Sequence, residues 1–177
     1  MTEHASDSFA ADAPPPGSYT LDPEQTAIHA NVKAMFGLFT VRGTFRLRSG
    51  QVSITADPGA SGVRASIDAG SFASGNATRD TDVISATLLD AKAYPEITFT
   101  GQGARRDGDG WVVAGSVTAH GTAVPAEVRL SDVRLEAGGT RFLATARLDR
   151  TSFGVTKKKG MVGRTVDLVI EAVARPA

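Results

Sequence analysis

The residues best suited to acid–base or metal chemistry are few in this chain. Its 177 residues include three histidines, His4, His29 and His120, and no cysteine. No two of the histidines have the short spacing of metal ligands, and the sequence places no carboxylates beside His29 and His120. Structural roles therefore suit these two histidines better than a metal site, and the lack of cysteine excludes disulfides and thiolate zinc sites.

Acidic and hydroxyl side chains are plentiful, but they follow no catalytic pattern. Asp80 and Asp82 are close in sequence, yet they fall in the first turn of an expected helix, where acids are favoured for electrostatic reasons alone. The chain has no nucleophile-elbow sequence and no glycine-rich phosphate loop between a strand and a helix. The sequence therefore predicts a protein that is not an enzyme and that has no metal and no cofactor.

Basic side chains gather in one short segment, where Lys157, Lys158 and Lys159 precede Gly160. Such a turn could meet an anionic group or an acidic membrane surface, and the alternative is an ordinary solvated loop. Over the whole chain, 19 Lys and Arg residues balance 19 Asp and Glu residues. This balance argues against an electrostatic nucleic-acid binder.

A period-two alternation of apolar and polar side chains predicts the elements that position these residues. It runs over residues 39–47 and again over 51–56, and Ser49-Gly50 between them is predicted to be the tight turn of a hairpin. Turns are also expected at Asp57-Pro58-Gly59 and at residues 107–110. Further alternating segments cover residues 63–69, 97–101, 111–117, 128–130, 142–148 and 166–172. Roughly eight strands at this spacing predict an all-β sandwich or barrel.

Short connections favour an eight-stranded antiparallel barrel over a sandwich, because up-and-down order lets the sheet close and removes its edges. One segment breaks the strand pattern. Residues 78–90 combine early acids with apolar residues at helical spacing, which predicts a short helix with Thr78 as its N-cap.

The first residues differ in composition from the rest. Residues 1–17 end in Pro14-Pro15-Pro16-Gly17 and contain no Lys or Arg, so they are expected to be a disordered lead rather than a secretory signal. No apolar run approaches the thickness of a bilayer. We therefore expect one domain over residues 18–177 and a cytoplasmic location.

Six segments in this order resemble the YceI-like family of polyisoprenoid-binding, lipocalin-like β-barrels. Together they extend from about Tyr19 to Ala174, and they are Tyr19-Thr20-Leu21-Asp22 with Ile28-His29, Val41-Arg42-Gly43-Thr44-Phe45, residues 90–99 around Tyr94-Pro95, residues 113–125 around His120-Gly121, Arg150-Thr151-Ser152-Phe153-Gly154-Val155, and Val162-Gly163-Arg164-Thr165-Val166. Ala34 stands where family members often have histidine, Leu88-Leu89 replaces a phenylalanine pair, and no export signal is evident.

The resemblance implies a long isoprenoid-tailed lipid, such as a quinone or a polyprenyl phosphate, bound without catalysis inside the barrel. Large and small inward residues can either fill such a barrel or leave a channel. The expected lining residues are Phe36, Phe39, Val41, Phe45, Ile67, Phe99, Val113, Phe142 and Phe153. The expected head-group residues at the rim are Arg79, Arg150, Lys157, Lys158 and Arg164, with Lys159 beside them. A homodimer is a further expectation, and the alternative function is a packed barrel that serves in protein interaction or stress response.

Overall fold

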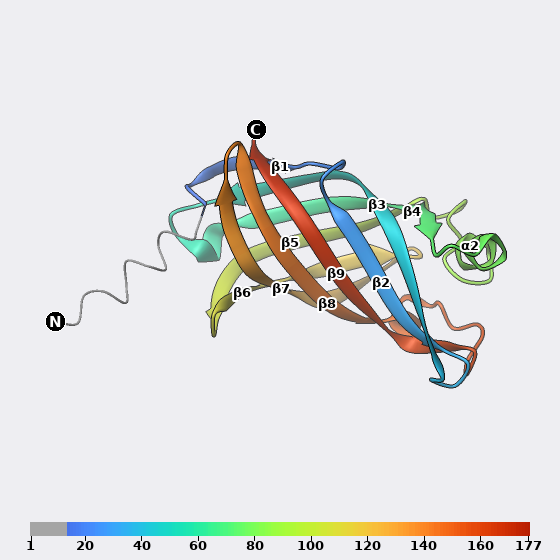
Figure 1. Ribbon diagram of the computed structural model, residues 1–177. Helices are drawn as coiled ribbons and strands as arrows, with labels where there is room; N and C mark the ends of the chain where they lie inside the picture. The colour runs from blue at the N-terminus through green and yellow to red at the C-terminus, as the bar shows by residue number, and fades with distance from the viewer. Residues whose placement is uncertain (1–13) are drawn as a thin grey trace.

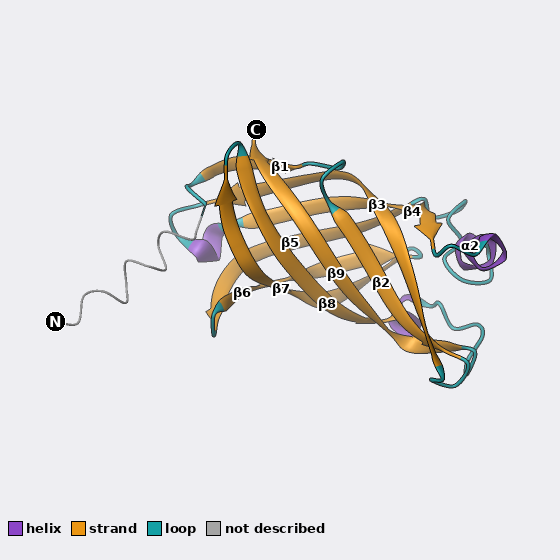
Figure 2. Ribbon diagram, in the orientation of Figure 1, coloured by secondary structure: helices purple, strands orange, loops and turns teal. Residues whose placement is uncertain are grey.

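The computed structural model describes residues 14–177, most of which belong to β-strands (Figure 1). Residues 1–13, the greater part of the predicted lead, lie outside the described residues. The strands form one curved wall, and the short helical segments lie at its two ends (Figure 2). In chain order the strands are β1 (Gly17–Leu21), β2 (Ala27–Ala34), β3 (Phe39–Ile54), β4 (Gly62–Ala73), β5 (Glu96–Asp107), β6 (Gly110–Ala119), β7 (Thr122–Glu136), β8 (Gly139–Asp149) and β9 (Val162–Pro176).

The sheet closes on itself. Each strand from β2 to β8 pairs antiparallel with the next one, and β9 pairs back onto β2. The short β1 extends the position of β2, because Tyr19 lies between Val52 and Pro176 just as Ile28 lies between Phe45 and Ile170. β1 and β2 therefore share one of eight positions, and the predicted eight-stranded antiparallel, lipocalin-like barrel is confirmed.

The two ends of the barrel differ in their connections. One end, here called the terminal end, carries the C-terminus, the short 3-10 helix η1 (Pro58–Ala60), and the tight turns at residues 108–109 and 137–138. The opposite end, here called the α2 end, carries the β2–β3 turn, the helix α2 (Ala77–Ile84), the β6–β7 turn and the 3-10 helix η2 (Arg150–Phe153) (Figure 1). The turns predicted at residues 57–59 and 107–110 are both present, and Asp57 caps η1 through its side chain.

The tight turn predicted at Ser49-Gly50 is wrong, because β3 runs unbroken through it. The register with β4 slips between Leu47 and Ser49, so that Arg48 and Ser49 are both exposed while Leu47 and Gly50 are buried. This is a β-bulge, in which one extra residue shifts the alternation by one position. A bulge and a hairpin turn both interrupt the period of two, and here Leu21 packs against Gly50 and holds the strand in place.

The predicted helix is present but shorter and differently capped. α2 starts after Asn76, whose Oδ1 accepts a hydrogen bond from Arg79 N at 3.0 Å, so Asn76 rather than Thr78 is the N-cap. The helix ends at Ile84, because the chain folds back and the amides of Leu89 and Ala91 donate to the carbonyls of Val83 and Ile84. Within residues 14–177, no helix is long and apolar enough to cross a bilayer.

Buried apolar side chains form two separate clusters, one toward each end. The first lies toward the terminal end and contains Tyr19, Leu21, Ile28, Leu47, Ala172 and Ala174. The second lies toward the α2 end and contains Leu88, Val117, Ala119, Phe153 and Val155. Leu88, Phe153 and Val155 come from the two long connections, which therefore cap the α2 end of the barrel.

Candidate functional site

The interior of the barrel combines aromatic rings with glycines on the neighbouring strands. The Phe99 ring lies across Gly101 and Gly115, where an added Cβ would come within 2.9 Å and 2.8 Å of its carbon atoms. The Phe72 ring covers Gly43 in the same way, with an added Cβ only 2.1 Å away. Because each ring occupies the space of a missing side chain on the wall, both rings lie against the wall.

The middle of the barrel lies between the two apolar clusters. Val128, Ala146 and Leu168 face inward here from β7, β8 and β9, and none of them belongs to either cluster. All three are only half-buried. Their cross-strand neighbours Ala30 and Val113 are buried and likewise belong to neither cluster, so the apolar side chains in the middle of the barrel are not part of one continuous core of the usual kind.

The inner wall is more accessible than the wall of a packed core. Among the described residues, Ile28 is the one large side chain that is less than 2% exposed. Phe45, Ile67, Phe99 and Phe142 also face inward, yet each of them is only half-buried. Close-packed interiors leave such side chains almost no accessible surface, and the interior wall is therefore not close-packed along its length.

The structure separates the nine predicted lining residues into three groups. Six of them face the interior, namely Val41, Phe45, Ile67, Phe99, Val113 and Phe142. Phe153 is buried in the cap at the α2 end. Phe36 and Phe39 lie instead at the β2–β3 turn, where their side chains are 81% and 62% exposed. The predicted strand pattern begins at Phe39, after Phe36, and the wall of the barrel does not enclose either residue.

Arg150 lies inside the β8–β9 connection rather than exposed at the rim. Its guanidinium donates hydrogen bonds to the carbonyl oxygens of Val155, Lys157, Val162 and Gly163, at 2.8–2.9 Å. Burial lowers the pKa of Arg150 from its usual range, and the side chain still carries its charge at neutral pH. Arg150 thereby holds together the two ends of the loop that carries the lysine turn.

The other predicted rim residues all lie at the α2 end. Lys157, Lys158 and Arg164 are exposed, and Lys158 pairs with Asp82 of α2 while Arg164 pairs with Asp149 at 2.7 Å. Arg79 is half-buried and donates to Ser74, the residue that leads into α2. The fold thus brings these basic groups together from segments that are far apart in the sequence.

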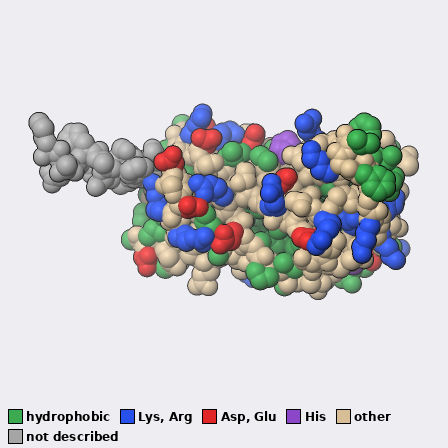
Figure 3. All heavy atoms as spheres, turned by 90° about the horizontal axis from the view of Figure 1, so that it is seen from below, with side chains coloured by type: hydrophobic (Ala, Val, Ile, Leu, Met, Phe, Trp, Pro, Cys, Tyr) green, Lys and Arg blue, Asp and Glu red, His purple; other side chains and the backbone are tan. Residues whose placement is uncertain are grey.

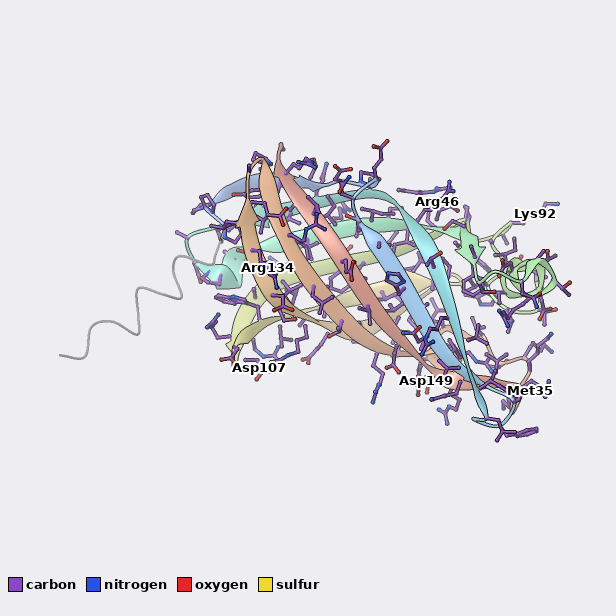
Figure 4. All side chains as sticks on the ribbon, in the orientation of Figure 1. Met35, Arg46, Lys92, Asp107, Arg134 and Asp149 are labelled. Atoms are coloured by element: carbon purple, nitrogen blue, oxygen red, sulfur yellow. The ribbon has the colours of Figure 1, made fainter. Side chains whose placement is uncertain are left out.

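Asp149 connects the end of β8 to this basic region (Figure 4). Its carboxylate caps η2 by accepting hydrogen bonds from the hydroxyl and amide of Thr151, at 2.6 Å and 2.9 Å, and it also accepts one from Arg164. These hydrogen bonds lower the pKa of Asp149 to about 2, and the bond from the Thr151 hydroxyl has the largest effect. The carboxylate is therefore charged at any physiological pH.

A pocket of about 500 Å³ opens between the β2–β3 turn and the β8–β9 connection. Its walls combine an aromatic ring with basic side chains and are formed by Phe36, Gly37, Arg150, Thr151, Thr156, Lys159, Gly160, Val162, Gly163 and Arg164. A second hollow, of about 450 Å³, lies on the outer face over β6–β9 and is lined largely by charged side chains that pair with one another, such as Arg129 with Asp107 and Arg147 with Asp167. Of the two, the pocket at the α2 end has the composition suited to an amphiphile with an anionic group.

Sequence reasoning missed two features of this site. Phe72 lies in the interior against Phe45, with ring centroids 5.3 Å apart. The pairing of β4 with β3 shifts register just before Phe72, so Phe72 is out of phase with the alternation of residues 63–69. Leu38 and Met161 join Phe36 and Phe39 in an exposed apolar group. The second feature could have been predicted from the sequence, because four of residues 35–39 are large and apolar, and such residues are unusual in an exposed hairpin turn.

The two histidines from residue 14 onward, His29 and His120, lie apart from each other. His29 is on the outer face of β2, opposite Thr44 and Val169. His120 is in the β6–β7 turn, where its ring contacts that of Tyr94 at 4.9 Å and its Nδ1 lies 3.2 Å from the Phe153 carbonyl oxygen. In the part of the chain from residue 14 onward, no group of three or more His, Asp or Glu side chains is arranged to hold a metal ion.

Comparison with known proteins identifies relatives of this chain. The model of the YceI-like domain family matches residues 19–174. A UPF0312 protein of Pseudomonas putida is 33% identical over 141 residues, which cover 76% of this chain and 73% of the relative.

Solved structures with the same fold include BcnA of Burkholderia cenocepacia, which is 23% identical with a TM-score of 0.76 over 86% of this chain and 98% of BcnA. A polyisoprenoid binding domain from Saccharophagus degradans, implicated in plant cell wall breakdown, is 16% identical with a TM-score of 0.67 over 90% of this chain and 98% of that domain. At these identities the similarity establishes the fold.

Proposed function

The chain belongs to the YceI-like domain family, and on that basis we propose that its barrel binds a long-chain amphiphilic lipid without catalysing a reaction. An isoprenoid tail, as in a quinone or a polyprenyl phosphate, is the specific ligand class. The domain from Saccharophagus degradans that shares the fold is described as polyisoprenoid-binding, and this description supports the assignment.

The accessible inner wall is the observation that carries the proposal. The large apolar side chains of Phe45, Ile67, Phe99 and Phe142 remain half-buried although they face the centre of a closed barrel. The gap between the two clusters, at Val128, Ala146 and Leu168, offers apolar surface without a polar group that would need a hydrogen-bond partner. Such a surface suits a hydrocarbon tail and provides no groups for acid–base chemistry.

The energetics favour a long tail. Each buried methylene contributes about 0.8 kcal/mol, while association costs an estimated 4–15 kcal/mol. A tail of about ten carbons therefore barely offsets the cost, and tight binding requires a longer one. An exposed ion pair to a head group adds only about 0–1 kcal/mol. In this proposal the tail sets the affinity, and basic groups at the α2 end, such as Lys159 and Arg164 in the pocket there, set the orientation.

Ala146→Phe tests the proposal because it adds a ring to the gap between the clusters. If this space accommodates the tail, the variant keeps its melting temperature and loses the uptake of long-chain quinones and lipophilic dyes. Native mass spectrometry and extraction of lipids after gentle purification would measure uptake. Ala114→Phe, which adds the same ring at an exposed position on the outer face of β6, is the matched control and should bind as the wild type does.

The opposite outcome is equally informative. In a packed barrel, the added ring of Ala146→Phe would destabilise the fold by about 1–3 kcal/mol, and the wild type would take up no long-chain lipid. That result would overturn the proposal and favour a domain whose barrel serves only as a scaffold for interaction.

A further inference from the structure

The apolar β2–β3 turn and the lysine turn beside it form one exposed surface at the α2 end. We propose that this surface docks the protein onto anionic lipid bilayers, with the apolar turn inserted among the lipids and the lysines at the head groups. The proposal goes beyond the binding of a lipid inside the barrel and does not depend on it.

Exposed apolar side chains are concentrated at this one place. Seven large hydrophobic residues are exposed in the part of the chain that the structure describes, and five of them belong here, namely Met35, Phe36, Leu38, Phe39 and Met161. Phe36 and Leu38 are 81% and 78% exposed. Figure 3 shows a protruding group of hydrophobic side chains at one end of the molecule, with Lys and Arg side chains beside it. Met35 marks the same end in Figure 4. Gathered exposed apolar surface of this kind marks an interaction site.

The backbone holds the apolar turn in an outward conformation. Met35 and Phe36 have φ angles of 51° and 57°, and Gly37 N donates to the Ala34 carbonyl oxygen at 3.1 Å. Together with Gly37, whose φ is 89°, these two residues form a left-handed turn within the four-residue loop between the paired residues Ala34 and Phe39, and such positions ordinarily favour Gly and Asn. Here Met and Phe occupy them at a conformational cost, which indicates that their side chains matter more than an easy turn does.

The apolar turn and the lysine turn are joined as one unit. Met35 N donates to the Met161 carbonyl oxygen at 2.9 Å, and Phe36 N donates to that of Gly160 at 2.7 Å. The Phe36 ring also lies over Gly160, where an added Cβ would come within 2.6 Å of it. The spacing between the apolar group and the lysines is therefore defined by the fold.

The chain segments that carry the apolar group contain basic residues but no acidic ones. Residues 27–56 and 150–166, which contain the two turns and the strand segments beside them, include no Asp or Glu, although the whole chain has 19. Acidic partners reach three of the cations from outside these segments: Glu96 pairs with Arg48, Asp82 with Lys158 and Asp149 with Arg164. Lys33, Lys157 and Lys159 form no ion pair with any residue from 14 to 177. Apolar side chains flanked by lysines are the pattern that binds at an anionic membrane interface.

The same charges disfavour a second copy of the chain as the occupant. Two-fold symmetric association through the apolar turn would bring the same patch of both subunits together. The lysine turns of the two copies would then lie close to each other, and like charges across an interface repel.

Binding to vesicles tests the proposal with the lipid-free, full-length protein. We expect the wild type to co-sediment with vesicles of phosphatidylcholine containing phosphatidylglycerol and to bind less to phosphatidylcholine alone. Phe36→Ser should weaken binding about ten-fold. Lys157→Ala with Lys159→Ala should weaken it about five-fold per lysine, and only on the anionic vesicles. Leu135→Ser is the matched control, because Leu135 is 50% exposed at the opposite, terminal end, and it should bind as the wild type does.

A tryptophan at the turn reports insertion directly. In Phe36→Trp, brominated lipids should quench the emission of the new tryptophan, whereas the natural Trp111 at the terminal end of β6 should be unaffected. Absence of wild-type binding to the anionic vesicles, or an equal loss in Leu135→Ser, would overturn the proposal. So would a wild-type dimer that Phe36→Ser converts to a monomer in light scattering while vesicle binding stays unchanged, since a second copy would then cover the turn. Uptake of lipid by the barrel is measured without vesicles, so its failure is distinguishable from a failure of docking.

Discussion

Arg150 is the residue whose role changes most between sequence and structure. Its charge predicts a position at the rim, but its guanidinium lies within the β8–β9 connection and binds four backbone carbonyl oxygens. The planar fork of an arginine can reach several carbonyls at once, which an ammonium group cannot do in the same geometry. The exposed lysine turn therefore rests on a buried arginine.

Arg150→Ala should lower the free energy of unfolding by about 3 kcal/mol, because buried carbonyl groups lose a charged donor. The melting temperature should then fall by about 6–12 °C, as measured by circular dichroism or calorimetry. Arg150→Lys should recover part of the loss, since it restores the charge but not the fork. A variant Arg150→Ala with unchanged stability would show that water replaces the guanidinium without cost.

At the scale of elements, the long strand β3 shows how a bulge serves the barrel. The extra residue at Arg48-Ser49 lets β3 pair first with β2 and then with β1 while its apolar residues stay inside. Gly50 follows the bulge, and the Leu21 side chain occupies the space where its Cβ would be. The split between β1 and β2 and the bulge in β3 are thus parts of one arrangement.

Gly50→Ala should destabilise the protein by about 1–3 kcal/mol, because an added Cβ would come within 2.5 Å of Leu21 Cδ1. Gly70→Ala is the matched control, since its Cβ would meet no atom closer than 3.5 Å. Denaturant unfolding of the two variants would compare them. Equal stability of the two variants would mean that Leu21 can move aside, and that the close packing of β1 on β3 is not required.

At the scale of the whole molecule, the barrel is asymmetric from end to end. The terminal end has short turns, whereas the α2 end combines the two long connections, the basic residues and the exposed apolar turn. A net charge of zero conceals this asymmetry. An interior site and an adjacent surface for the bilayer at the same end would give a lipid a short path between them.

The length of the bound tail should determine how much a ligand stabilises the barrel. A quinone with one isoprene unit should leave the melting temperature unchanged, because the burial of about five carbons does not offset the cost of association. A long-tailed quinone at about a hundred times its dissociation constant should add about 2.7 kcal/mol, a rise of about 5–11 °C. Thermal unfolding with a series of tail lengths would measure this, and a shift independent of length would assign the affinity to the head group instead.

Alternation of side chains was enough to predict the class of fold, the number of strand positions and most of the inner wall. Phe45, Ile67, Phe99 and Phe142 point inward because period-two patterning reports the face of a strand directly. Local signals also located the turns at residues 57–59 and 107–110, since proline, glycine and aspartate act there through their own backbone preferences.

Three outcomes depended on contacts between distant segments. Whether Ser49-Gly50 is a turn or a bulge was decided by the packing of Leu21 on Gly50. Whether Arg150 is exposed was decided by the carbonyl groups of the loop that folds around it. Phe39 begins the strand pattern and Phe36 precedes it, and both lie where the hairpin extends past the wall of the barrel. The sequence by itself determined which face of each strand is apolar, because that is a local property of the chain. Only the tertiary structure decided where the wall ends and which polar groups it encloses, because both depend on which segments meet when the barrel closes.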